Sequence, residues 1–174
     1  MTFVGNIFLI GFMGTGKSAV AREIHDRYGM KLLEADALIA EKEGLSIPEI
    51  FKRKGEAYFR DLETDFLKSL KNMEHTVVSC GGGMALRSEN VASMKELGQV
   101  VWLMASPSVI LERVKGDTNR PLLQDNFDVD FIRALLAKRK EAYEIAADLR
   151  IDTDGKTIEE VTKYLYSNNE EAYV

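Results

Sequence analysis

Cysteine, histidine, proline and tryptophan are scarce in this sequence. Cys80 is the only cysteine among 174 residues, so the chain cannot form an internal disulfide, which fits a reducing compartment and predicts a cytoplasmic protein. No group near Cys80 marks it as an activated nucleophile, and we expect a small buried apolar side chain. The two histidines stand apart and predict no metal site; we expect His25 on a helix surface and His75 at a strand edge.

Positive charge and long apolar runs are limited as well. The chain has 23 basic and 28 acidic residues, and the net charge of −5 argues against a nucleic acid held on a broad basic face. No apolar run is long enough to span a membrane, and residues 1–13 lack the basic flank and cleavage site of a signal peptide. The length predicts one domain, residues 1–174, and we expect a monomer without membrane or nucleic-acid partners.

The most informative stretch reads Gly-Phe-Met-Gly-Thr-Gly-Lys-Ser, from Gly11 to Ser18. It follows an apolar run typical of a buried strand and precedes a segment, up to Tyr28, with the three-and-four apolar spacing of a helix. This context favours a phosphate-binding loop over a glycine-rich turn that binds nothing, because bare backbone N–H groups and a helix N-terminus attract an anion. Lys17 is expected to reach the β- and γ-phosphates of a nucleotide, and the Ser18 hydroxyl to bind Mg²⁺. The expected ATP-binding residues of this loop are Gly14, Thr15, Gly16, Lys17, Ser18 and Ala19.

Short strands and helices alternate along the rest of the chain, which predicts an α/β fold with a mainly parallel sheet covered on both faces. Further strands are expected at residues 31–36, 75–80, 99–104 and 149–151, and helices at residues 56–70, 88–97 and 130–146. Ser46 and Thr157 each open a further helix, because a glutamate three residues later completes a capping box. Ser106-Pro107 is expected to open another.

Two acidic residues, Glu34 and Asp36, end the second predicted strand. On extended chain they point the same way and are placed to face a metal ion and a substrate. A solvated strand end, or a helix capped by Asp36, explains them equally well. Three glycines, 81–83, end the next strand; they favour a ligand site at the carboxyl edge of a parallel sheet, with a flexible turn as the alternative.

Three further features involve arginine. Arg60 and Glu63 are neighbours on one helix face, where spacing alone favours an exposed ion pair. Arg139 falls within an apolar helix stripe, so it either pairs with a carboxylate or extends its charged end to water. The polar segment of residues 115–128, which contains Arg120, is typical of a lid that closes over a ligand, with a disordered insertion as the alternative.

Taken in order, these motifs resemble the shikimate kinase family, P-loop kinases similar to nucleoside monophosphate kinases. The resemblance covers nearly the whole chain. The segments that carry it are the P-loop, Glu34 with Asp36, Phe59-Arg60-Asp61-Leu62-Glu63, Gly81-Gly82-Gly83, Arg120-Pro121-Leu122-Leu123, and Arg139 four residues before Tyr143.

The resemblance implies a three-layer P-loop fold with a five-stranded parallel sheet in the order 2-3-1-4-5. It also implies a substrate-binding helical region at about residues 34–62 and a mobile lid at about residues 114–127. The implied activity is ATP-dependent phosphorylation of the shikimate 3-hydroxyl, within aromatic amino acid biosynthesis, with Mg²⁺ as cofactor.

The family also implies roles for single residues. Lys17, Asp36 and Arg120 would be catalytic: Asp36 would bind the shikimate hydroxyls and take the proton, and Arg120 would neutralise the transferring phosphate. Arg60 and Arg139 would hold the shikimate carboxylate. The other implied contacts are Glu63, which would orient Arg60, Gly82 and Gly83 on shikimate, and Arg113 and Asp154 beside adenine.

One residue departs from the family pattern, which usually has Asp-x-Asp where this chain has Glu34-Ala35-Asp36. The first acid of that pattern would act on Mg²⁺ through water, together with Ser18, and glutamate is one methylene longer than aspartate. The charge is therefore preserved while the metal geometry can differ.

Other functions fit less of the sequence. A kinase for gluconate or a nucleotide would share the P-loop and lid, but Arg60, Glu63 and Arg139 favour a cyclic hydroxy acid. A GTPase would need a switch motif earlier than Asp152-x-x-Gly155, and the guanine motif Asn-Lys-x-Asp is missing. A silent nucleotide-binding module is disfavoured because no element of the active set is missing.

Overall fold

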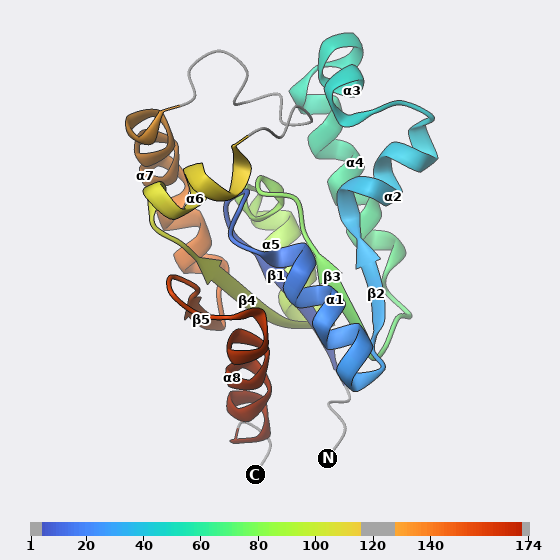
Figure 1. Ribbon diagram of the computed structural model, residues 1–174. Helices are drawn as coiled ribbons and strands as arrows, with labels where there is room; N and C mark the ends of the chain where they lie inside the picture. Colours follow the sequence, from blue (N-terminus) through green and yellow to red (C-terminus); the bar gives the residue numbers. More distant parts are fainter. Residues whose placement is uncertain (1–4, 116–127, 172–174) are drawn as a thin grey trace.

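The computed structural model describes residues 5–115 and 128–171. Within them, five strands form one sheet in the order β2-β3-β1-β4-β5, and every neighbouring pair is parallel (Figure 1). This confirms the implied fold class and strand order. The strands are β1 (Asn6–Ile10), β2 (Lys31–Glu34), β3 (Thr76–Ser79), β4 (Gly98–Met104) and β5 (Leu149–Asp152).

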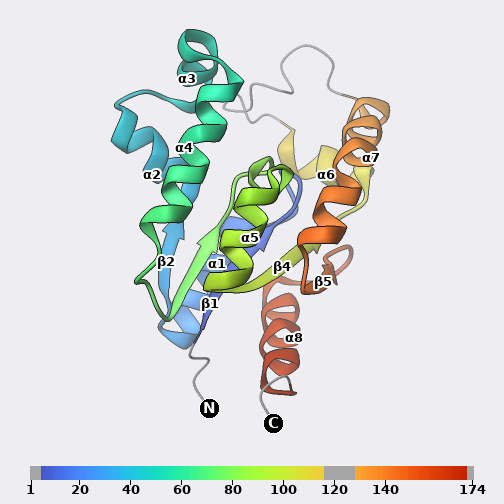
Figure 2. The ribbon, with the colours of Figure 1, turned by 180° about the vertical axis from the view of Figure 1, so that it is seen from behind.

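Helices cover both faces of the sheet. α1 (Lys17–Tyr28) and α8 (Ile158–Glu171) lie on the face seen in Figure 1. The opposite face carries α4 (Glu56–Ser69), α5 (Ser88–Leu97) and α7 (Val129–Ala146), as Figure 2 shows. The short segments η1 (Met84–Leu86) and α6 (Pro107–Val114) follow β3 and β4.

The central strand β1 explains this three-layer arrangement. Its side chains alternate between the two faces, as in any strand, and all of them are buried. Ile7 and Leu9 join the core beneath α1 and α8, whereas Phe8 and Ile10 join the core beneath α4, α5 and α7. A strand buried on both sides needs a continuous apolar run, which is the pattern of this segment.

A small helical unit extends from the edge strand β2. It consists of α2 (Ala35–Glu43), α3 (Ile47–Lys54) and α4, and it has its own core around Ile39, Ile50 and Phe59. The predicted capping box at Ser46 is present: its hydroxyl accepts from the Glu49 N–H, and the Glu49 carboxylate accepts from the Ser46 N–H. The second predicted box, at Thr157, is present as well.

The boundary of β2 differs from the prediction. The strand ends at Glu34, and Asp36 lies in the first turn of α2, so the two acids do not lie on one extended segment. The segment from Ala35 to Glu43 is rich in good helix formers, and a carboxylate in the first turn is favoured by the helix dipole. These local preferences end the strand two residues early.

Other features of the described chain are simple. Cys80 is a buried free cysteine, as predicted, and burial raises the pKa of its thiol. His25 is an exposed helix residue, also as predicted. In the part of the chain that the structure describes, no helix has both the length and the apolar character needed to cross a membrane.

Asn6 connects the amino ends of the central strands through hydrogen bonds. Its side chain is 4% exposed, and its amide donates to the carbonyls of Met73 and Leu97 at 2.8 and 2.9 Å. Its oxygen accepts from the Thr76 N–H at 3.1 Å. One buried side chain therefore links β1 to the start of β3 and to the end of α5.

Replacing Asn6 with alanine leaves these three buried or partly buried backbone groups without this partner. We expect Asn6→Ala to lower the free energy of unfolding by about 2–3 kcal/mol, measured by urea denaturation. Asn168→Ala is the matched control, because that amide makes one exposed bond, to the Tyr164 carbonyl; it should change stability by less than about 0.5 kcal/mol. Equal effects of the two substitutions would contradict this account.

Candidate active site

The P-loop lies at the carboxyl end of β1, with α1 beginning directly after it. Gly14 and Gly16 have φ angles of +76° and +94°, a backbone conformation that side chains with a Cβ rarely adopt. The buried Thr15 hydroxyl donates to the Phe12 carbonyl at 2.8 Å and closes the turn. The N-cap residue of α1 is Gly16, which has no side chain to occupy the first N–H groups, the groups that an anion would bind.

Lys17 is buried inside this loop. Its ammonium donates to the carbonyls of Gly11 and Phe12 at 2.8 and 2.9 Å. The positive charge therefore lies against the backbone of the loop that the sequence predicts for phosphate binding.

Three side-chain oxygens meet where β1, β2 and β3 end. The Ser18 hydroxyl donates to the Glu34 carboxylate at 2.9 Å and lies 3.2 Å from the Ser79 hydroxyl. The parallel register explains the cluster, because Glu34 and Ser79 are directly paired across β2 and β3. Glutamate here reaches the serine of the P-loop directly.

This oxygen cluster suits Mg²⁺. The ion prefers oxygen ligands and usually keeps several waters, taking one or two protein groups together with substrate phosphates. Among the residues that the structure describes, no group of three or more Asp, Glu, His or Cys could form an all-protein metal cage. One hydroxyl and one carboxylate beside the P-loop are the donors expected for a metal brought in with a nucleotide.

The three glycines after β3 form a turn whose bare backbone several charged side chains approach closely. A Cβ at Gly81 would lie 2.6 Å from Asp36 Oδ1 and 3.0 Å from Glu63 Oε1. A Cβ at Gly82 would lie 3.2 Å from an Arg139 nitrogen. At Gly83 it would overlap the Arg60 guanidinium.

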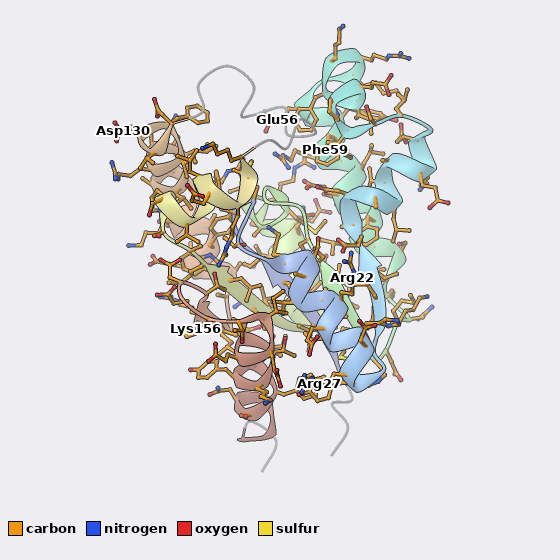
Figure 3. The ribbon with its side chains drawn as sticks, in the orientation of Figure 1. Arg22, Arg27, Glu56, Phe59, Asp130 and Lys156 are labelled. Atoms are coloured by element: carbon orange, nitrogen blue, oxygen red, sulfur yellow. The ribbon has the colours of Figure 1, made fainter. Side chains whose placement is uncertain are left out.

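Arg60 and Glu63 form a buried ion pair, so the exposed pair favoured by helical spacing is wrong. Glu63 is fully buried, Arg60 is 9% exposed, and their closest atoms are 2.9 Å apart. The reason is that α4 also packs against α5: Thr64, one residue after Glu63, donates to the buried Asn90. Arg60 has a second partner, the Glu56 carboxylate at 3.1 Å. Figure 3 shows Glu56 and Phe59 on α4, near the end of the molecule that carries the P-loop.

The pKa of the Glu63 carboxyl is unusually high. Burial raises its pKa to about 7, although Arg60 opposes the rise; the nearby Asp36 adds to it. Oε1 of Glu63 is buried and has no hydrogen-bond partner among the described residues. This oxygen faces Gly81, beside Asp36.

Arg139 enters the same space from α7. Its side chain is 6% exposed, and its guanidinium lies over the Phe12 ring, 5.5 Å from the centroid. Burial contradicts the alternative that this arginine extends its charge to water. Arg60 and Arg139 therefore approach adjacent glycines from two different helices, with the P-loop residue Phe12 beside them.

Arg113 and Asp154 lie on the other side of the P-loop. Arg113 donates to the Gly14 carbonyl at 3.2 Å and to the Thr153 hydroxyl at 3.1 Å. The Asp154 carboxylate accepts from the Ser106 N–H at 3.0 Å, and so holds the turn between β4 and α6. The structure brings both residues beside the P-loop; Arg120 and most of the predicted lid, residues 116–127, lie outside the described residues.

Two residues of this site, Ser79 and Glu56, were not among those expected from the sequence. Ser79 had a usable signal, since it is a polar residue at the carboxyl end of a buried strand. Glu56 lies four residues before Arg60, a spacing that predicts helix neighbours.

The raised pKa of Glu63 predicts a pH-dependent stability. Between its unfolded value of 4.5 and about 7, the folded protein keeps a proton that the unfolded chain has lost. This group therefore stabilises the fold below pH 4.5, and its contribution declines as the pH rises through about 7, by on the order of 3 kcal/mol.

Glu63→Gln removes this titration. We expect the variant to gain stability relative to wild type between about pH 5 and pH 8 in urea denaturation. If the difference in the free energy of unfolding between Glu63→Gln and wild type did not change with pH, the raised pKa of Glu63 would be contradicted.

Comparisons with known proteins agree with this geometry. The family model for shikimate kinase matches residues 13–169. A shikimate kinase from Geobacter sulfurreducens is 48% identical over 156 residues, covering 90% of this chain and 86% of that protein. The structure of a shikimate kinase from Acinetobacter baumannii in complex with shikimate superposes with a TM-score of 0.93 at 32% identity, covering 98% of this chain and 96% of that one. For the shikimate kinase from Aquifex aeolicus the TM-score is 0.81 at 39% identity, with 97% and 98% covered. The chain therefore belongs to the shikimate kinase family.

Proposed function

We propose that the chain transfers the γ-phosphate of ATP to the 3-hydroxyl of shikimate, giving shikimate 3-phosphate and ADP. The observation that carries this proposal is the pair of buried arginines, Arg60 and Arg139, that face a glycine turn next to a P-loop. Two guanidinium groups at one turn favour a small acceptor with a carboxylate, because arginine binds carboxylates with paired hydrogen bonds.

The P-loop side would bind ATP. Backbone N–H groups and the start of α1 would surround the phosphates, and Lys17 would leave its loop carbonyls for the β- and γ-phosphates. Arg113 and the segment around Asp154 would lie beside adenine, since both lie at the P-loop edge away from the glycine turn. Arg120, from the predicted lid, would neutralise the transferring group.

Ser18 and Glu34 would hold Mg²⁺, with Glu34 acting through water. When bound, the ion supplies positive charge that polarises the phosphates and offsets their repulsion of the incoming oxygen. The Ser18–Glu34 contact fits this assignment, and it supports the longer acid as a working replacement for aspartate.

The glycine-turn side would bind shikimate. Arg60 and Arg139 would hold the carboxylate, Glu63 would orient Arg60, and the backbone of Gly82 and Gly83 would lie against the ring. Asp36 would accept the proton of the 3-hydroxyl as the new O–P bond forms, while the bond between the γ-phosphorus and the β–γ bridging oxygen breaks and ADP leaves. A closed site without bulk water would limit transfer to water.

All groups named here come from a single chain, so we propose that the enzyme acts as a monomer. Two arginines lie among the residues that would bind the acceptor, and this disfavours a neutral sugar as the acceptor. Gluconate and nucleotides remain the acceptors against which the assignment is tested.

The decisive measurement is ADP release with ATP and Mg²⁺, in the presence and absence of shikimate. We expect release that depends on shikimate and exceeds that with gluconate or a nucleoside monophosphate by at least about 100-fold. Protein that binds ATP but releases ADP equally with and without shikimate would contradict the proposal.

Arg139 should govern acceptor affinity. We expect Arg139→Ala to raise the KM for shikimate by about 30-fold or more, because a charged group loses a buried partner, and to leave the KM for ATP within about twofold. Arg139→Lys keeps the charge but not the paired geometry and should recover only part of the loss. The exposed neighbour Lys138 provides the control, since Lys138→Ala should leave both constants unchanged. An unchanged KM for shikimate in Arg139→Ala would overturn the carboxylate assignment.

A further inference from the structure

Tyr143 makes a hydrogen bond that the proposed roles do not use. Its hydroxyl donates to the Gly82 carbonyl at 2.6 Å, a short bond between α7 and the glycine turn. The side chain is 1% exposed, and its ring packs against Trp102 of β4, with the ring centroids 5.6 Å apart. A buried aromatic ring gives this hydroxyl a fixed position.

Arg139 lies one helical turn before Tyr143 on the same face of α7. Burial raises the pKa of the Tyr143 hydroxyl, and the charge and hydrogen bond of Arg139 oppose that rise. The hydroxyl therefore stays protonated at neutral pH and remains a donor to Gly82. Because the Arg139 guanidinium also lies against the Gly82 backbone, arginine, tyrosine and carbonyl form one contiguous group.

The bond to the Gly82 carbonyl has a consequence for the next N–H. The peptide unit between Gly82 and Gly83 is planar, so fixing the carbonyl of Gly82 also fixes the direction of the Gly83 N–H, which points the opposite way. Consecutive glycines have the most freedom of backbone rotation and no side chains to restrict it. A bond from the Met84 N–H to the Gly81 carbonyl at 3.1 Å closes the turn, and the Tyr143 hydroxyl adds a direct restraint on its central peptide.

We propose that Tyr143 is a positioning residue for the acceptor: its hydroxyl fixes the Gly82–Gly83 peptide, beside the Arg139 guanidinium, in the orientation that receives the acceptor's carboxylate and ring. This inference rests on the proposed function for the identity of the acceptor, shikimate. The restraint on the peptide is a property of the protein alone and is measured without any ligand.

The test removes the hydroxyl and keeps the ring, with Tyr143→Phe in the full chain. We expect the dissociation constant and the KM for shikimate to rise about 5- to 10-fold, with the KM for ATP and kcat within about twofold. In the protein without ligand, the amide resonance of Gly83 should shift and its hydrogen exchange should accelerate. A purely structural role in the core would lower thermal stability without separating the constants for shikimate and ATP.

Tyr166→Phe is the matched control, because Tyr166 is also buried, at 8% exposure. Its hydroxyl donates to the Met30 sulfur in the core beneath α1 and α8. It should leave shikimate binding and the Gly83 amide unchanged. Unchanged shikimate affinity in Tyr143→Phe, in a wild-type background that is active with shikimate, would overturn the inference. If wild type neither binds nor phosphorylates shikimate, the proposed function fails. The restraint on the peptide is then tested by the Gly83 amide resonance alone, and an unshifted resonance in Tyr143→Phe would overturn the inference as well.

Discussion

The site depends on the close approach of charged side chains to backbone that has no Cβ. Asp36, Glu63, Arg139 and Arg60 come from three helices, and each of them lies against one of three consecutive glycines. Any larger residue in that turn would displace a carboxylate or a guanidinium. The sheet makes the approach possible, since it places the turn after β3 beside the P-loop after β1. The P-loop and the glycine turn are thus separated by the spacing of two neighbouring strands.

Charge balance is the second property of this region. Two arginines and two carboxyl groups are gathered where little water reaches, and burial of unpaired charge is strongly unfavourable. Glu63 meets this constraint by pairing with Arg60, and its raised pKa lets it take up a proton near neutrality. Arg139 has the face of Phe12 beside it and no carboxylate within salt-bridge distance among the described residues. An anionic acceptor would complete the balance at that arginine.

The sequence predicted most of the scaffold and only part of this geometry. The P-loop, both capping boxes and the alternation of strands and helices follow from local residue patterns, and those parts of the fold are confirmed. The start of α2 at Ala35 was not predicted, because the spacing of Glu34 and Asp36 was interpreted on an extended chain. Helix propensity determines the backbone conformation from Ala35 onward. Helical spacing identified Arg60 and Glu63 as neighbours but could not say that the glycine turn after β3 lies against them. The bond from Tyr143 to Gly82 joins residues 61 positions apart, which no local pattern specifies. Arg120 stays a prediction, because it lies outside the described residues.

The crowding around the glycine turn also has a genetic consequence. Every missense change of one nucleotide in a glycine codon gives a residue that carries a Cβ. At residues 81–83, each such change therefore places a Cβ against the end of a charged side chain, that of Asp36, Glu63, Arg139 or Arg60, which has to shift. A substitution in the turn is therefore also a change in the position of at least one of these four side chains.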